Sequence, residues 1–229
     1  MRRMLCAAIA GTVVASMSVL AAPKDQTGKF NEAATVLREI HQAPDKGIPN
    51  DLWAKATCVA VFPSLKKAAF IIGGEFGKGV MSCRSGNGWS APAIMEMQKG
   101  SFGAQIGAET VDLILLVMNE EGAHRLLENK VSLGGEASVA GGPVGRDARA
   151  MTNAQLKAQI LSYSRSQGLF AGLDVSGGTL EPAHSDNREL YGQQATAREV
   201  VSSGKIAPPK EAAQFMAALR QTVPAKDKD

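Results

Sequence analysis

Residues 57–89, TCVAVFPSLKKAAFIIGGEFGKGVMSCRSGNGW, contain three short apolar runs, Thr57–Phe62, Ala68–Gly74 and Gly79–Arg84. Pro63 ends the first run, and the polar segment Ser64–Lys67 after it predicts a turn. The segment 85–88, Ser-Gly-Asn-Gly, is a second turn signal. Short apolar runs that are separated by short turns are typical of antiparallel strands, so this stretch predicts a β-meander.

Strand-length runs continue toward the C-terminus. Strands are expected over residues 91–97, 103–109, 111–118, 160–164 and 169–175, and residues 134–149 are expected to be a strand followed by a loop. The run Leu113–Val117 lacks alternation, which indicates burial on both faces of a sheet. The chain has 24 glycines, clustered between residues 73 and 178, and this clustering favours tight turns and bulges in a β-rich region.

Helices are expected before, within and after this β-rich region. Residues 27–42 repeat apolar side chains at helical spacing, and Asn119 is a good N-cap for a helix through Leu127. Thr152 and Gln155 predict a capping box. The last helices are expected over 189–201, unless Gly192 breaks it, and from Pro208 to Thr222. The expected fold is therefore α+β: a single domain whose curved, mainly antiparallel, barrel-like sheet of six or more strands is flanked by N-terminal, central and C-terminal helices.

The N-terminus has the pattern of a secretory signal peptide. Arg2 and Arg3 precede an uncharged apolar run, residues 5–20, and small residues stand at Val19 and Ala21. We expect cleavage after Ala21, a single domain over 22–222, a disordered tail over 223–229 and a periplasmic or secreted location. An uncleaved anchor is the alternative. Because Cys6 lies near the start of the apolar run rather than after it, a lipoprotein is not expected.

Composition excludes several classes of protein. The 229 residues are 45% hydrophobic and 21% charged, which is ordinary for a globular chain and excludes collagen-like, coiled-coil and wholly disordered proteins. The net charge of +3 is too small for a protein that binds nucleic acid by neutralising phosphates.

Export changes how the cysteines are interpreted. Cys6 would leave with the signal peptide, so Cys58 and Cys83 would remain as an even pair in an oxidising compartment. A disulfide is the simplest expectation, and two buried free thiols are the alternative. Two such ligands are too few for a structural zinc site.

The sequence carries no complete catalytic or cofactor motif. The string Gly73–Gly79 lacks the spacing and the Ser or Thr of a phosphate-binding loop. His41, His124 and His184 are far apart and have no ligand-spaced neighbours. We therefore expect neither an enzyme, nor a cofactor, nor a metal site; a hydrolase whose site assembles from dispersed residues is a weak alternative.

Two features could contact a lipid surface. Lys66 and Lys67 lie together in the expected turn, where they could meet an anionic headgroup; a solvated turn is the alternative. The helix over 27–42 could lie on a membrane with Phe30, Leu37 and Ile40 inward, or it could pack on the domain. Two lysines supply too little energy to hold a protein on a membrane, so apolar area, on this helix or in a cavity of the sheet, should supply most of the affinity.

Six ordered blocks resemble the SYLF domain family. They are CVAVFPSLKKAAFIIGGEFGKGV (58–80), GWSAPA (88–93), GSFGAQIGAETVDLILLVMN (100–119), SVAGGPVGR (138–146), YSRSQGLFAGLDVSGG (163–178) and LYG (190–192). The resemblance covers roughly residues 40–222. It implies a lipid-binding protein without enzymatic activity, because secreted bacterial relatives are regarded as lipid-binding and yeast and animal members are implicated in phosphoinositide and actin binding.

In the animal members, phosphoinositide binding is attached to an N-terminal amphipathic helix. The resemblance thus implies that the helix over 27–42 is the corresponding feature, with Lys29 and Arg38 as its cations. We do not expect actin binding, because an exported chain would not meet cytoplasmic actin. The expected function is a non-enzymatic, exported lipid-binding protein of the cell envelope that contacts membrane lipids. The alternative is a structural or protein-interaction module that docks an envelope protein.

Overall fold

The structure is a computed structural model that describes residues 26–43, 47–69, 72–86, 88–102, 107–145, 151–166 and 169–222. The expected signal peptide and the expected C-terminal tail lie outside the described residues.

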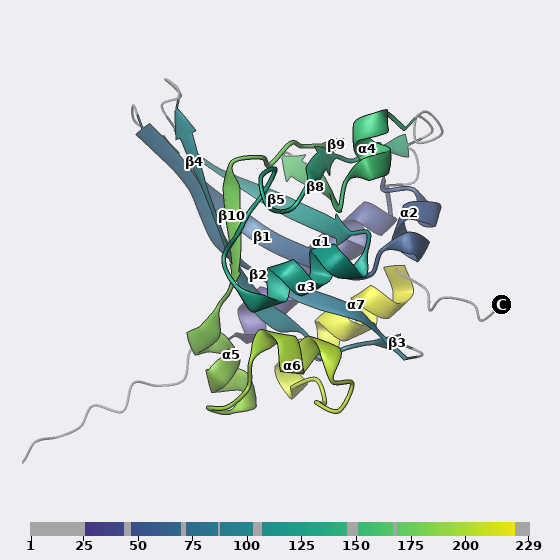
Figure 1. Cartoon of the computed structure of the whole chain (residues 1–229), viewed down its shortest axis with the longest axis vertical. Helices are drawn as coiled ribbons and strands as arrows, with labels where there is room; N and C mark the ends of the chain where they lie inside the picture. Colours follow the sequence, from purple (N-terminus) through teal and green to yellow (C-terminus); the bar gives the residue numbers. More distant parts are fainter. Residues whose placement is uncertain are drawn as a thin grey trace, which may run out of the picture.

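The described residues form one curled sheet of ten strands (Figure 1). The strands are β1 (Cys58–Ala69), β2 (Ile72–Ser85), β3 (Gly88–Trp89), β4 (Ala93–Phe102), β5 (Gly107–Val117), β6 (Val131–Ser132), β7 (Val139–Gly141), β8 (Ile160–Ser166), β9 (Leu169–Gly172) and β10 (Gly178–Pro182). Their order is β6-β10-β4-β2-β1-β5-β8-β7, with β3 on β2 and β9 on β8. Among the paired strands of the described residues, β7 and β8 are parallel and the other pairs are antiparallel, so the expected curved, mainly antiparallel sheet is confirmed as a half-barrel.

Helices cover both faces of this sheet. They are α1 (Thr27–His41), α2 (Asn50–Lys55), α3 (Glu120–Glu128), α4 (Asn153–Lys157), α5 (His184–Tyr191), α6 (Ala197–Ser202) and α7 (Ala213–Thr222), with a 3-10 turn η2 (Lys210–Ala212). α1, α2 and α7 pack on one face, here called the α1 face, and α3 and α6 pack on the other, the α3 face. The expected α+β class with N-terminal, central and C-terminal helices is confirmed.

Strand alternation divides the core into two layers. In β1, Val59 and Val61 face α1 and α7, whereas Ala60 and Phe62 face α3 and α6. The strand β5 is buried in the same two-sided way: residues 113–117 are at most 1% exposed. Burial on both faces removes the polar half of the alternation, so the uninterrupted apolar run in β5 was interpreted correctly.

Pro63 does not end the first strand, so the predicted turn over Ser64–Lys67 is wrong. β1 continues to Ala69 through a β-bulge, at which its register with both neighbours shifts. Ser64 takes a left-handed φ of 50°, and its N–H donates to Asp112 Oδ1 at 2.9 Å. Because the bulge inserts an extra residue, the strand re-enters the sheet instead of turning back.

Beyond the bulge, the central strands leave their helical cover. Figure 1 shows β1, β2 and β4 continuing past the helices toward the upper left. The connection between β1 and β2 falls at residues 70–71 and that between β4 and β5 at 103–106, both outside the described residues. Lys66 and Lys67 therefore belong to a strand and not to a hairpin tip.

Three other expectations change in detail. The strands expected over 103–109 and 111–118 fall on one strand, β5 (Gly107–Val117), and residues 103–106 lie outside the described residues. The helix expected over 189–201 is divided into α5 and α6, because Gly192 takes a φ of 98° and a Thr196–Glu199 capping box starts the second helix. The strand β10 was not predicted.

Close packing in the β1–β2 hairpin requires glycine at position 79. A Cβ atom there would lie 2.4 Å from Phe62 Cδ1 and 2.5 Å from the Val61 carbonyl oxygen. We expect Gly79→Ala to lower the free energy of unfolding by about 1–3 kcal/mol, as overpacking does. Gly100→Ala is the matched control, because a Cβ there meets nothing within 4 Å. Equal urea midpoints for the two variants would contradict this account.

The hydroxyl of Tyr163 in β8 is buried and has no hydrogen-bond partner among the described residues. Burial raises the pKa of this phenol well above its usual value. Because an unpaired buried hydroxyl carries a desolvation penalty, Tyr163→Phe should leave stability unchanged or raise it by about 1 kcal/mol. The hydroxyl of Tyr191, in contrast, donates to the Pro92 carbonyl at 2.5 Å. Tyr191→Phe should therefore lower the free energy of unfolding by about 1 kcal/mol. Thermal unfolding of both variants measures the difference, and a clear loss in Tyr163→Phe would refute it.

Candidate functional site

The apolar stripe of α1 belongs to the core. Phe30 and Leu37 are fully buried and Ile40 is 2% exposed. The ring of Phe30 lies 6.4 Å from that of Phe215 in α7. The apolar stripe is therefore not available to a membrane in this structure, because packing against α7 and the sheet already removes it from water.

The predicted cations lie in two places. Lys29 is half-buried in the first turn of α1, and Arg38, further along, donates to Thr35 Oγ1 at 3.2 Å. Burial is the largest cause that lowers the pKa of Lys29. Lys66 is exposed on β1 beyond the bulge, and the backbone of Lys67 pairs with those of Glu75 and Glu109.

A buried ion pair fixes the start of α1 to the sheet. Lys78 of β2 is in a salt bridge with Asp186 of α5, whose side chain is 2% exposed, and with Glu96 of β4 at 3.0 Å. The Gln26 side-chain amide donates to the same Asp186 carboxylate at 3.1 Å. Although burial alone would lower the pKa of Lys78, hydrogen bonds to the two carboxylates raise it. Sequence reasoning missed this cluster because its members come from four separate elements.

The uncovered end of the sheet presents one large apolar side chain among polar ones. Phe76 of β2 is 52% exposed, and its cross-strand neighbours are Lys66 on β1 and Gln98 on β4. With Thr110 of β5, opposite Lys66, these exposed residues form what we call the projecting surface. A hollow of about 540 Å³ lies beside it, between Phe76, Gln98 and Thr179 of β10.

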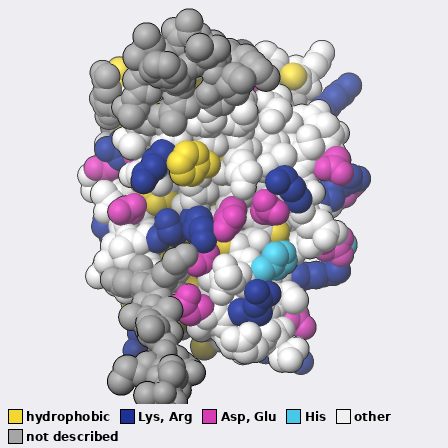
Figure 2. Space-filling model, turned by 90° about the vertical axis from the view of Figure 1, so that its left-hand side faces the viewer, with side chains coloured by type: hydrophobic (Ala, Val, Ile, Leu, Met, Phe, Trp, Pro, Cys, Tyr) yellow, Lys and Arg dark blue, Asp and Glu magenta, His cyan; other side chains and the backbone are white. Residues whose placement is uncertain are grey.

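Charge on the molecule is mixed. Figure 2 shows basic and acidic side chains interspersed on one side of the molecule rather than gathered into a field of one sign.

Phe76 could have been found from the sequence, because a large apolar residue between Gly74 and Gly77 has few side-chain neighbours that could bury it.

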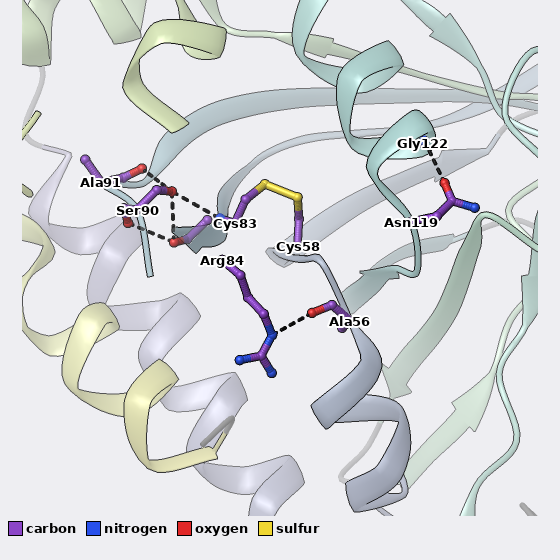
Figure 3. Close-up of a disulfide and its surroundings, with 9 residues drawn as sticks. Ala56, Cys58, Cys83, Arg84, Ser90, Ala91, Asn119 and Gly122 are labelled. Atoms are coloured by element: carbon purple, nitrogen blue, oxygen red, sulfur yellow. Dashed lines mark hydrogen bonds between the residues drawn. A yellow bond between two sulfur atoms is a disulfide. The ribbon is translucent and has the colours of Figure 1, made fainter. Parts of the chain in front are cut away.

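The structure contains the expected Cys58–Cys83 disulfide (Figure 3). The two cysteines are cross-strand partners at the covered ends of β1 and β2. Next to them, the Arg84 guanidinium donates to the carbonyl oxygens of Ala56 at 2.9 Å and Trp53 at 3.1 Å. Arg84 thus satisfies carbonyl groups at the C-terminal end of α2.

The described residues include neither a cluster of metal ligands nor a helix that could span a membrane. The three histidines lie on three different helices, α1, α3 and α5, and no described group of three or more His, Cys, Asp or Glu side chains could hold a metal ion. No described helix is long and apolar enough to cross a bilayer.

Comparison with known proteins adds the family. Residues 98–222 match the Ysc84 family model, described as "Las17-binding protein actin regulator". LAS seventeen-binding protein 3 of Saccharomyces cerevisiae is 36% identical over 196 residues, which cover 82% of this chain and 42% of that protein. SH3 domain-containing YSC84-like protein 1 of Xenopus laevis is 32% identical over 200 residues, which cover 84% of this chain and 59% of that protein.

The chain therefore spans about two fifths to three fifths of these relatives, and the matches extend over most of its own length. On the strength of the family model and of these relatives, the chain belongs to the Ysc84 family, the family of SYLF domains.

Proposed function

We propose that this protein is a non-enzymatic lipid-binding protein of the cell envelope, exported after removal of residues 1–21. The observation that carries the proposal is the projecting surface. Phe76 is 52% exposed there, at an end of the sheet, and no described helix covers that end. An exposed aromatic side chain beside a lysine suits the boundary between acyl chains and headgroups, since the ring enters the apolar region while the ammonium stays near phosphate.

The energies favour a contact in which apolar area dominates. Burying the exposed half of Phe76 would contribute about 1–1.5 kcal/mol. Lys66 would add about 1 kcal/mol near an anionic surface. Because these two contributions give only weak binding, the surface fits a reversible peripheral contact rather than permanent anchoring.

The test is flotation of the purified protein with neutral phosphatidylcholine vesicles and with vesicles that also contain phosphatidylglycerol. We expect Phe76→Ser to lower affinity for both about tenfold. We expect Lys66→Gln to lower affinity about fivefold for the anionic vesicles alone, mainly at low salt, because exposed charges are screened.

Leu156→Ser is the matched control. Leu156 is 65% exposed on α4, which packs beside β7 at one edge of the sheet. Its replacement should leave binding unchanged. Binding that survives Phe76→Ser, or that is lost equally in Leu156→Ser, would overturn the assignment to the projecting surface.

A second candidate is a contact with an envelope protein through the same surface. It is favoured by the relatives' names, since LAS seventeen-binding protein 3 is named for a protein partner. Photo-crosslinking from position 76 in cells separates the two: lipid adducts support the first candidate, and one discrete protein adduct that disappears in Lys66→Glu supports the second.

A further inference from the structure

A pocket of about 310 Å³ opens on the α3 face, far from the projecting surface along β1 and β2. It lies where α3 and α6 meet the covered ends of these strands. Both cysteines of the disulfide line it, together with the apolar side chains of Ala123, Leu127 and Val201. The sulfur bond thus forms part of the wall of a cavity instead of being enclosed by packed side chains on every side.

The two cysteines differ in exposure: Cys58 is fully buried, whereas Cys83 is 6% exposed. Of the two residues, Cys83 is therefore the one with surface open to solvent, which makes its sulfur the candidate for attack.

Permanent positive charge stands at the rim of the pocket. Arg198 of α6 donates from Nη1 to Glu128 Oε1 at 2.5 Å, and its Nη2 lies 2.6 Å from His124 Nε2. The side chain of Arg198 is 49% exposed. Arg84 also lines the pocket, but its guanidinium is directed toward Ala56 (Figure 3). Glu120 is the acidic residue of the lining.

Other bonds hold these strand ends when the sulfur bond is open. The Arg84 N–H donates to the Thr57 carbonyl at 2.8 Å, and the Cys83 N–H donates to Ser90 Oγ at 3.1 Å. The Ser90 N–H donates to the Cys83 carbonyl at 2.8 Å. We therefore expect the fold to remain in place when the disulfide is open.

We propose that this pocket is a thiol-exchange site, at which a small anionic thiol opens the Cys58–Cys83 disulfide in the folded protein. The thiolate of the small molecule attacks Cys83 Sγ. A new S–S bond forms between them as the Cys58–Cys83 bond breaks, and its electron pair leaves with Cys58 as a thiolate, which then takes a proton from solvent. The thiolate of a second small molecule then attacks the sulfur of the bound one, the bond between that sulfur and Cys83 Sγ breaks, and Cys83 leaves as a thiolate that takes a proton from solvent while the two small molecules depart as their disulfide. Arg198 favours the step, because a nearby cation stabilises attacking and leaving thiolates.

The experiment uses the purified, oxidised full chain with mercaptoacetate as the probe and uncharged 2-mercaptoethanol for comparison. Released thiol is alkylated and the modified cysteines are located by mass spectrometry. We expect a rate proportional to mercaptoacetate concentration. In protein alkylated at early times, after the first step and before the second, we expect the probe on Cys83 and the alkyl group on Cys58. Arg198→Gln should slow the reaction of mercaptoacetate about three- to tenfold at low salt, and that of 2-mercaptoethanol less.

Glu128→Gln gives a change in the opposite direction, because it frees Arg198 from its carboxylate partner and should speed the reaction of mercaptoacetate. Arg220→Gln on α7 is the control for loss of one exposed arginine and should react like the unmodified protein. The proposal is overturned by a rate independent of thiol concentration, which means that the bond is reached only after unfolding. It is equally overturned by attachment of the probe to Cys58, or by Arg198→Gln and Glu128→Gln variants that keep their folded circular dichroism and react at the unmodified rate.

Discussion

The carboxylate of Asp112 holds the point at which the sheet changes from a covered core to an uncovered extension. It accepts the Ser64 N–H of the β1 bulge and pairs with Arg165 of β8 at 3.5 Å, and Arg165 also forms a salt bridge with Glu39 of α1. Strands β1, β5 and β8 and helix α1 are therefore joined at one position. The half-buried carboxylate of Asp112 fixes the bulge because it accepts the N–H of Ser64. This hydrogen bond offsets the strain of the left-handed conformation of Ser64.

The position of the bulge divides the β1–β2 hairpin into a covered end and an uncovered end. Before it, alternate residues enter two separate cores, and the disulfide lies at the far end of this covered part. After it, the alternation is displaced by one residue, so Leu65 turns to the α3 face and Lys66 to the α1 face. The glycines of β2 suit the same geometry. A Cβ at Gly77 would lie 2.6 Å from Leu65 Cδ2, so the strands can approach closely only because glycine stands opposite the residues that follow the bulge.

Sequence reasoning recovered the features that local chemistry dictates. The Asn119 cap, the Thr152–Gln155 capping box and the stripe of α1 depend on residues three or four apart, and the structure contains each of them. The disulfide followed from the parity of two cysteines. The turn at 64–67 failed because proline followed by a polar run has the same local pattern whether a strand ends or bulges, and the difference depends on Asp112, 48 residues away.

The candidate surface was harder to predict for the same reason. The α1 stripe has the amphipathic pattern of a membrane-bound helix, but the identical pattern is required for packing on α7, and only the position of Phe215 decides between them. Lys66 was identified correctly as an exposed cation, yet its neighbour Phe76 is brought beside it by strand register, which the sequence specifies only once the bulge is known.

Among the described residues, Phe76 is the one large aromatic side chain that is exposed, and it lies in a strand. Among the described residues, the large hydrophobic side chains that remain exposed are Phe76, Leu156 and Leu169, while both cores are closed. Leu156 and Leu169 lie in short elements, α4 and β9, whose ends leave little area with which to bury them. Phe76, in contrast, lies in the interior of a 14-residue strand flanked by paired strands on both sides, where a polar side chain would satisfy the same backbone. This exposed ring is the reason to propose binding at this end of the hairpin, whereas the stripe of α1 is buried in the core.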